Sequence, residues 1–99
     1  MITMNIGLND KDSLKQEIET QAAIKLIANL VGDCTIKTGN FGIYTMDNGE
    51  TVIENSLEVI SYTLDMTTGK EIAKQLCKEL NQESIYVSPC AIDSELVRA

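Results

Sequence analysis

The chain of 99 residues contains no histidine, no tryptophan, one proline and one phenylalanine. Histidine is the commonest general base and the commonest metal ligand in proteins, so its absence removes the simplest routes to both kinds of site. Basic residues are also scarce: eight Lys and Arg face fifteen Asp and Glu, which leaves a formal net charge of −7. Direct nucleic-acid binding is therefore not expected, because affinity for phosphates comes from clustered Lys and Arg.

Long apolar runs and signal-like segments are missing too. No run approaches the roughly 18 apolar residues that a membrane span needs, and the first residues lack the basic and apolar regions of a signal peptide. The three cysteines, Cys34, Cys77 and Cys90, are widely spaced and form no C-x-x-C pair. This spacing disfavours a zinc knuckle, a redox pair and a disulfide framework. We expect a cytoplasmic protein with reduced thiols, no cofactor, no metal and no membrane contact.

The sequence does contain enough apolar residues, 43%, for one packed domain over residues 1–99. Apolar residues alternate with period two in four segments and recur with helical spacing in two others. The expected elements are a strand over 2–8, a helix over 20–31, strands over 34–46 and 51–64, a helix over 68–81 and a strand over 84–88. This β-α-β-β-α-β order predicts an α+β, ferredoxin-like fold: a four-stranded antiparallel sheet with both helices on one face. Residues 90–99 are expected to form a tail or an edge strand.

Turn and cap residues add detail to this outline. Gly39 and Gly42 interrupt the second strand and predict a β-bulge, because glycine inside a strand pattern often marks one. The Asn48-Gly49 pair predicts the turn of a hairpin between the second and third strands. Thr68 and Glu71 match the capping box that opens many helices.

No catalytic residue stands out. Ser and Thr have no histidine to activate them, and Cys90 is close in sequence to Asp93 and Glu95, which oppose thiolate formation. Glu54 and Glu58 share one face of a predicted strand, but they are about 13 Å apart along it. That separation exceeds the spacing of the paired carboxylates in glycoside hydrolases, about 9.5 Å at most. We therefore expect no enzymatic activity and no catalytic, cofactor-binding or metal-binding residue.

Four segments carry a resemblance to a known group of proteins. They are Ile-Gly-Leu-Asn-Asp-Lys-Asp at 6–12, Gly-Ile-Tyr at 42–44, Glu-Asn-Ser-Leu at 54–57 and Asn-Gln-Glu-Ser-Ile at 81–85. With these segments the chain resembles small uncharacterised ferredoxin-like proteins of bacteria, plasmids and phages. The segments are interpreted as structural: a strand end, a hairpin and a helix-to-strand junction. The resemblance implies the same fold and a mobile-element origin, and it implies no particular activity.

Acidic residues on the predicted hairpin lead to the main functional hypothesis. Asp47, Glu50, Glu54 and Glu58 place carboxylates where they could occupy an Arg- and Lys-rich groove of another protein. The chain is thus predicted to be a small acidic, non-enzymatic protein-binding module, with these four residues as its contact surface. Its partner would be the basic surface of a nucleic-acid-handling host protein, and anti-CRISPR-like inhibition by a phage or mobile element is one instance.

An alternative hypothesis is an enzymatic or small-molecule-binding module that forms a homodimer. A sheet covered by helices on one side leaves its other face open, and a second copy can cover it with a ligand between the two. A buried, unpaired carboxylate facing a pocket would favour this alternative, whereas a flat acidic face would oppose it. The fold alone does not decide between the two, because ferredoxin-like domains have many unrelated functions.

Overall fold

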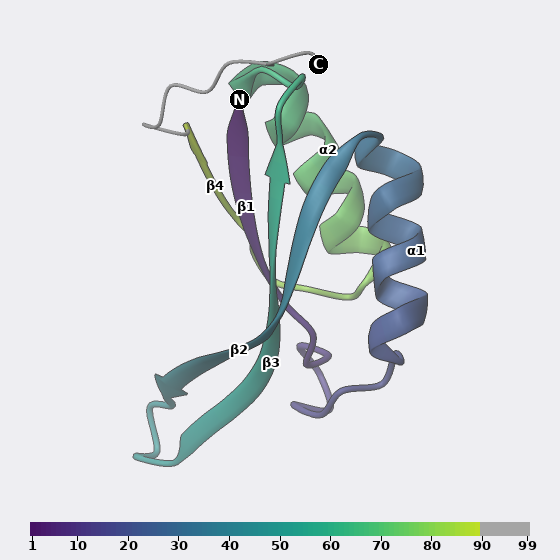
Figure 1. Ribbon diagram of the computed structural model, residues 1–99. Helices are drawn as coiled ribbons and strands as arrows, with labels where there is room; N and C mark the ends of the chain where they lie inside the picture. Colours follow the sequence, from purple (N-terminus) through teal and green to yellow (C-terminus); the bar gives the residue numbers. More distant parts are fainter. Residues whose placement is uncertain (90–99) are drawn as a thin grey trace.

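Two helices cover one face of a four-stranded sheet in the computed structural model, which describes residues 1–89 (Figure 1). The order of the strands across the sheet is β2-β3-β1-β4, and every pair of neighbours is antiparallel. The predicted ferredoxin-like fold is therefore confirmed, while the predicted tail or edge strand over 90–99 lies outside the described residues. The elements are β1 (Ile2–Gly7), α1 (Thr20–Val31), β2 (Cys34–Thr45), β3 (Thr51–Ser61), α2 (Met66–Glu79) and β4 (Tyr86–Pro89).

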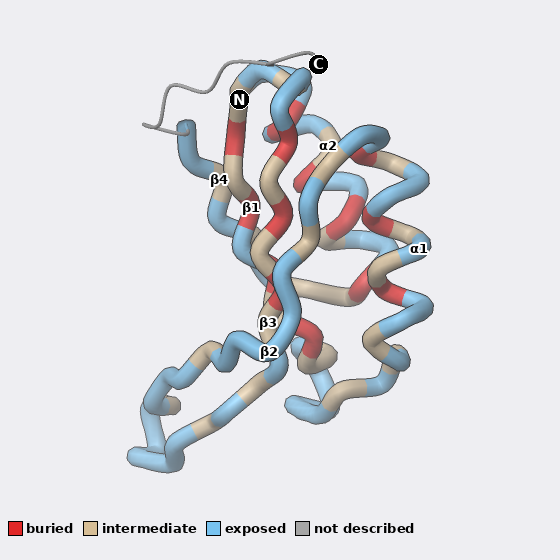
Figure 2. Tube along the Cα trace, in the orientation of Figure 1, coloured by how far each residue is buried: buried red, intermediate tan, exposed pale blue. Residues whose placement is uncertain are grey.

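The core lies between the sheet and the two helices (Figure 2). Period-two alternation in β1 directs Ile2, Met4 and Ile6 toward the helices, and each is at most 1% exposed. Helical spacing directs one stripe of each helix back toward the sheet, with Ile27 and Leu76 fully buried. Neither helix of residues 1–89 is long and apolar enough to cross a membrane.

Helix α2 begins earlier than its sequence signal predicts. Asp65, not Thr68, is the N-cap, and its side chain accepts a hydrogen bond from the Thr68 backbone N–H at 2.8 Å. The predicted capping box of Thr68 and Glu71 is therefore wrong. The earlier start places Gly69 inside the first turns of the helix, where it is buried directly against Ile2 of β1. Packing of the helix on the sheet thus favours the Asp65 cap.

Two predicted irregularities of the β2–β3 hairpin are confirmed. The pairing register shifts between Lys37 and Asn40, and Gly39 within this bulge has a φ of 81°. At the turn, Gly49 has a φ of 87° and donates its N–H to the carbonyl of Met46 at 2.9 Å. Both glycines occupy the left-handed region, which side chains disfavour.

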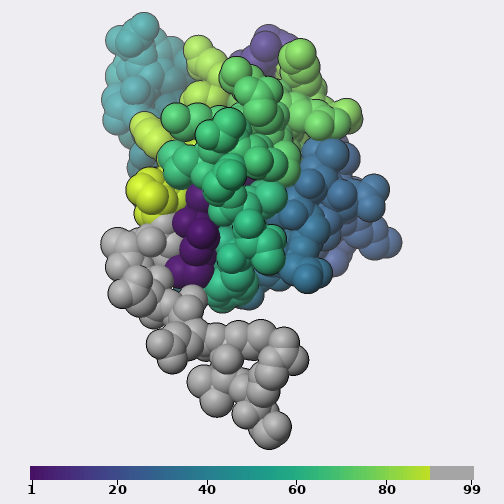
Figure 3. Space-filling view, turned by 90° about the horizontal axis from the view of Figure 1, so that it is seen from above, coloured from purple at the N-terminus to yellow at the C-terminus, as the bar shows by residue number. Residues whose placement is uncertain are grey.

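The outer part of the hairpin extends beyond the helices, so only the inner part of β2 and β3 contributes to the core. No residue from Asn40 to Asn55 is buried, and the tube in Figure 2 shows this segment projecting away from the buried positions. From above, the end of the hairpin (teal) lies on the opposite side of the molecule from α1 (blue) (Figure 3). This projection creates a concave surface where the hairpin leaves the sheet.

Candidate functional site

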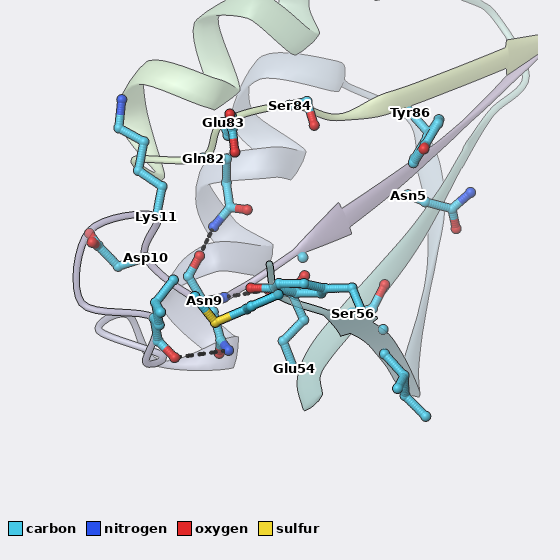
Figure 4. A pocket seen from close by; sticks show the side chains of 16 residues that line it. Asn5, Asn9, Asp10, Lys11, Glu54, Ser56, Gln82, Glu83, Ser84 and Tyr86 are labelled. Atoms are coloured by element: carbon cyan, nitrogen blue, oxygen red, sulfur yellow. Dashed lines mark hydrogen bonds between the residues drawn. The ribbon is translucent and has the colours of Figure 1, made fainter. Parts of the chain in front are cut away.

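A cleft of about 610 Å³ lies where the hairpin leaves the sheet (Figure 4). Ligand sites in proteins are usually clefts of about 300–1,000 Å³, so this volume suits a small molecule. Its walls come from four parts of the chain: β1, the loop after β1, the hairpin, and the segment between α2 and β4. The lining residues lie within 5–7, 9–14, 42–46, 54–56 and 82–86.

One wall of the cleft is formed by the sheet, on the face that the two helices do not cover (Figure 1). Because Met4 and Ile6 of β1 point toward the helices, Asn5 between them and Gly7 after them face the other way. Residues paired directly across antiparallel strands share a face, so Ser56 opposite Gly7 lies on this side as well. The regular alternation of β1 thus supplies a small, polar floor to the cleft.

Glu54 is held in the cleft by a close approach of its carboxylate to β1 and by a hydrogen bond. Its carboxylate lies against Gly7, in space that a Cβ at position 7 would occupy, and its stem lies beside Gly42. Its Oε2 accepts a hydrogen bond from the backbone N–H of Asn9 at 3.0 Å. A charge-assisted bond of this kind is stronger than a neutral one, so the carboxylate has a defined position.

The loop after β1 is anchored to the end of α2. Asn81 donates its side-chain N–H groups to Asp10 at 2.7 Å and to Asp12 at 2.9 Å. The Asp10 carboxylate also accepts the backbone N–H groups of Asp12 and Ser13. The bond from Asn81 and then these backbone bonds hold the pKa of Asp10 below its usual value. The loop is therefore a well-connected wall of the cleft.

Charge and aromatic surface in the cleft favour a cation that carries a planar ring. Among residues 1–89, three carboxylates, of Asp10, Glu54 and Glu83, line the cleft, and Lys11 is the single basic residue that does so. Tyr44 and Tyr86 also line it, and the exposed fraction of Tyr86 is 80%. Tyrosine rings offer faces on which a flat ring or a cation can stack.

Thiol chemistry has little support at Cys34 and Cys77. Burial raises the pKa of both thiols, and for Cys34 the neighbouring Asp33 raises it further. Among residues 1–89, no group of three or more His, Cys, Asp or Glu side chains is arranged to hold a metal ion. Cys90 lies outside the described residues. The carboxylates and amides of the cleft are therefore the candidate functional groups.

The four acidic residues singled out from the sequence occupy different surroundings. Glu54 lines the cleft, whereas Glu58 lies four residues further along the same face of β3 and forms an ion pair with Lys37 at 3.9 Å. Asp47 and Glu50 lie in the exposed turn of the hairpin. The structure thus brings one of the four into the cleft, and their predicted role as a partner-binding surface stays a prediction.

The sequence interpretation missed Asn9, Gly42 and Gln82 as cleft residues. Each lies in one of the four segments that carry the family resemblance, and all four segments contribute to the lining of the cleft. The segments had been interpreted as structural only. Their convergence on one cleft is the signal that could have identified the site, but it needs the three-dimensional arrangement.

Comparison with known proteins gives matches among solved structures only. No protein-family model and no curated protein matches the chain. A phage SAM lyase in complex with S-methyl-5'-thioadenosine matches with a TM-score of 0.65 and 24% identity, over 87% of this chain and 75% of that one. A phage SAM lyase in the apo state matches with a TM-score of 0.61 and 24% identity, over 87% and 74% of the two chains. The chain thus shares its fold with a small phage protein.

These matches correct the main functional hypothesis. The expectation of a non-enzymatic protein-binding module, acting as an anti-CRISPR-like inhibitor, is wrong, because the solved structures that share the fold are of an enzyme. One of them holds a small molecule, which favours the alternative of an enzymatic or small-molecule-binding module. The acidic composition misled because a net negative charge suits a cleft for a cation as well as a surface for a basic protein. The cleft beside Glu54 agrees with the alternative.

Proposed function

We propose that the protein is a lyase that binds S-adenosylmethionine (SAM) in the cleft beside Glu54 and cleaves it. The observation that carries this proposal is a positioned carboxylate facing a cleft of suitable volume, in the fold of a phage SAM lyase. A phage or other mobile-element origin and a cytoplasmic location belong to the same proposal.

The chemistry of SAM suits a chain without histidine. Conversion of SAM to S-methyl-5'-thioadenosine breaks the bond between the sulfonium sulfur and the γ-carbon of the amino-acid chain, and the electron pair of that bond stays on sulfur. The carboxylate of the substrate itself can form the new bond to the γ-carbon, which closes a lactone and balances the step. The departing group is a neutral thioether, so it needs no proton from a general acid. The enzyme then has to bind and orient the substrate rather than protonate its leaving group. The absence of histidine is no obstacle to this reaction.

The charges of the cleft match those of the substrate. SAM carries a sulfonium and an ammonium, and we assign Glu54 as the carboxylate that faces the positive part of the molecule. Lys11 is available to the substrate carboxylate, and Tyr44 and Tyr86 are available to the adenine ring. Counter-charges that are already fixed in place bind a charged substrate without reorganisation cost and orient its reacting atoms.

Self-association belongs to the proposal because the outer hairpin leaves apolar side chains uncovered. Phe41 is 65% exposed, Ile43 68% and Ile53 61%, and Ile43 pairs directly with Ile53. Monomeric proteins rarely expose contiguous apolar patches of this kind. A second copy that covers this hairpin patch (Phe41, Ile43 and Ile53) would protect it from water.

Incubation of the purified protein with SAM tests the proposal. Reversed-phase chromatography should detect S-methyl-5'-thioadenosine, and the Glu54→Gln variant should form it at least about a hundredfold more slowly, in the range seen when a stabilising group is removed. Glu58→Gln is the matched control, because Glu58 is on the same sheet face but outside the cleft. Absence of both cleavage and saturable SAM binding in calorimetry would overturn the proposal, and binding without cleavage would identify a small-molecule-binding module.

A further inference from the structure

A glutamine just after α2 contacts the segment that holds Glu54. Gln82 is fixed at the helix end, where its backbone N–H donates to the carbonyl of Cys77 at 2.8 Å. The residue before it, Asn81, has a φ of 49° and turns the chain away from the helix axis. The half-buried side chain of Gln82 then reaches the loop after β1, where its Nε2 donates to the carbonyl oxygen of Asn9.

Asn9 connects this glutamine to the carboxylate in the cleft. The two peptide groups that flank Asn9 have different partners: the carbonyl accepts from Gln82, and the N–H donates to Glu54 Oε2 at 3.0 Å. Figure 4 shows the two bonds in succession, from Gln82 to Asn9 and from Asn9 to Glu54. Because both bonds act on one residue, fixing the carbonyl of Asn9 also restricts the direction of its N–H.

Other contacts hold the rest of the loop independently of Gln82. The backbone N–H of Lys11 donates to the carbonyl of Asn81 at 3.0 Å, and Asp10 N–H donates to the carbonyl of Lys15 at 2.7 Å. The Asn81 side chain also bonds Asp10. Asp10 N–H belongs to the same peptide group as the Asn9 carbonyl, and the Asn9 side chain donates to the carbonyl of Leu14 at 3.2 Å. Loss of the Gln82 side-chain bond should therefore leave the loop in place and loosen the orientation of Asn9 without freeing it.

We infer that Gln82 is a positioning residue, which acts through Asn9 to direct the carboxylate of Glu54 into the cleft. Its effect on the reaction rests on the proposed function, whereas its effect on Asn9 does not. Displacement of a reacting or stabilising group by about 1 Å can slow an enzyme about a hundredfold. The loss should fall mainly on kcat, because the substrate-binding walls of the cleft remain.

The variant Gln82→Met removes the donor and preserves the length of the side chain. We expect kcat for SAM cleavage to fall about tenfold to hundredfold, with KM changed less than about threefold. In the Glu54→Gln background the same substitution should have almost no further effect, because residues that act through one another are non-additive. Gln75→Met, at an exposed position of α2, is the matched control and should leave kcat unchanged.

The backbone amide signal of Asn9 in ¹H–¹⁵N NMR spectra gives a second measurement that does not need turnover. In Gln82→Met it should shift in the same direction as in Glu54→Gln and exchange faster with solvent, while signals of Val59 to Ser61, at the other end of β3, stay in place. Equal kcat for Gln82→Met and wild type, or additive losses in the double variant, would overturn the inference. If wild type forms no S-methyl-5'-thioadenosine, the proposed function fails. An unmoved Asn9 signal in Gln82→Met would then still overturn the inference, because this measurement does not need turnover.

Discussion

The carboxylate of Glu54 lies directly against the α-carbon of Gly7, in space that any side chain at position 7 would fill. Gly7 does not have a positive φ, so its backbone conformation does not require glycine. The alternation of β1 alone would allow a small polar side chain at position 7, because the open face of the sheet carries polar residues such as Asn5 and Ser56. The close approach of Glu54 is therefore the physical reason for glycine at this position.

Gly7→Ala should move the carboxylate without unfolding the protein. A Cβ at position 7 would overlap both oxygens of Glu54, but the end of a glutamate side chain can rotate away. We expect SAM cleavage to slow at least about tenfold, with little change in the melting temperature. Gly42→Ala is the control, since its Cβ would lie 3.4 Å from Glu54 Cγ, an ordinary contact. Equal activity of the two variants would contradict this role for Gly7.

The loop after β1 should loosen in acid. Bonds from Asn81 and from backbone N–H groups hold the pKa of Asp10 below its usual 3.8. Its contribution to stability is therefore present above pH 3.8 and is lost as the pH falls through the lower folded value. Urea denaturation between pH 5 and pH 2 should show a smaller loss of stability for Asp10→Asn than for wild type. Identical pH dependence in the two proteins would rule out this contribution.

The contact between α2 and β1 should not tolerate a large side chain at position 69. Gly69 is buried, and a Cβ there would overlap the end of Ile2, which is itself 1% exposed. Gly69→Leu should therefore lower the free energy of unfolding by about 1–3 kcal/mol through overpacking, measured by urea denaturation. The same substitution at the exposed neighbour, Lys70→Leu, should have a much smaller effect. A stable Gly69→Leu variant would show that the helix can move away from the sheet.

Self-association should depend on the outer hairpin. Replacing Ile43 and Ile53 by Ser removes most of the apolar surface of their cross-strand pair. Sedimentation velocity should show a single larger species for wild type and a monomer for this double variant. Tyr62→Ser is the control, because Tyr62 is 53% exposed but follows the end of β3. A wild-type monomer at high protein concentration would argue against a second copy on this surface.

The fold could be predicted because each element carries a local signal. Alternation in β1 and helical spacing in α1 depend on neighbours a few residues away, and these signals gave element boundaries within a few residues of the structure. The start of α2 was missed because two local cap signals compete there: Asp65 and Thr68 are both preferred N-cap residues, and the structure uses Asp65.

The candidate site depends on contacts between distant parts of the chain. Asn9 and Glu54 are 45 positions apart, and Gln82 and Asn9 are 73 apart. Glu54 was singled out from the sequence, but as one of four similar carboxylates on a hairpin. Nothing local distinguishes it from Glu50, and only its approach to Gly7 and to the Asn9 amide does so. The polar residues that matter to the site were therefore the hardest to recognise.

The bulge in β2 has a consequence for the wall of the cleft. Between Lys37 and Asn40, β2 contains one residue more than the matching stretch of β3. Each later side chain of β2 therefore points to the other face of the sheet from the one that regular pairing would give it. With this extra residue Gly42 pairs with Glu54, and Phe41 lies on the opposite face. If Gly39 were instead paired regularly with β3, without a bulge, Phe41 would stand opposite Glu54, where Gly42 now leaves room. The bulge thus keeps an aromatic ring out of the cleft and leaves room for the Glu54 side chain.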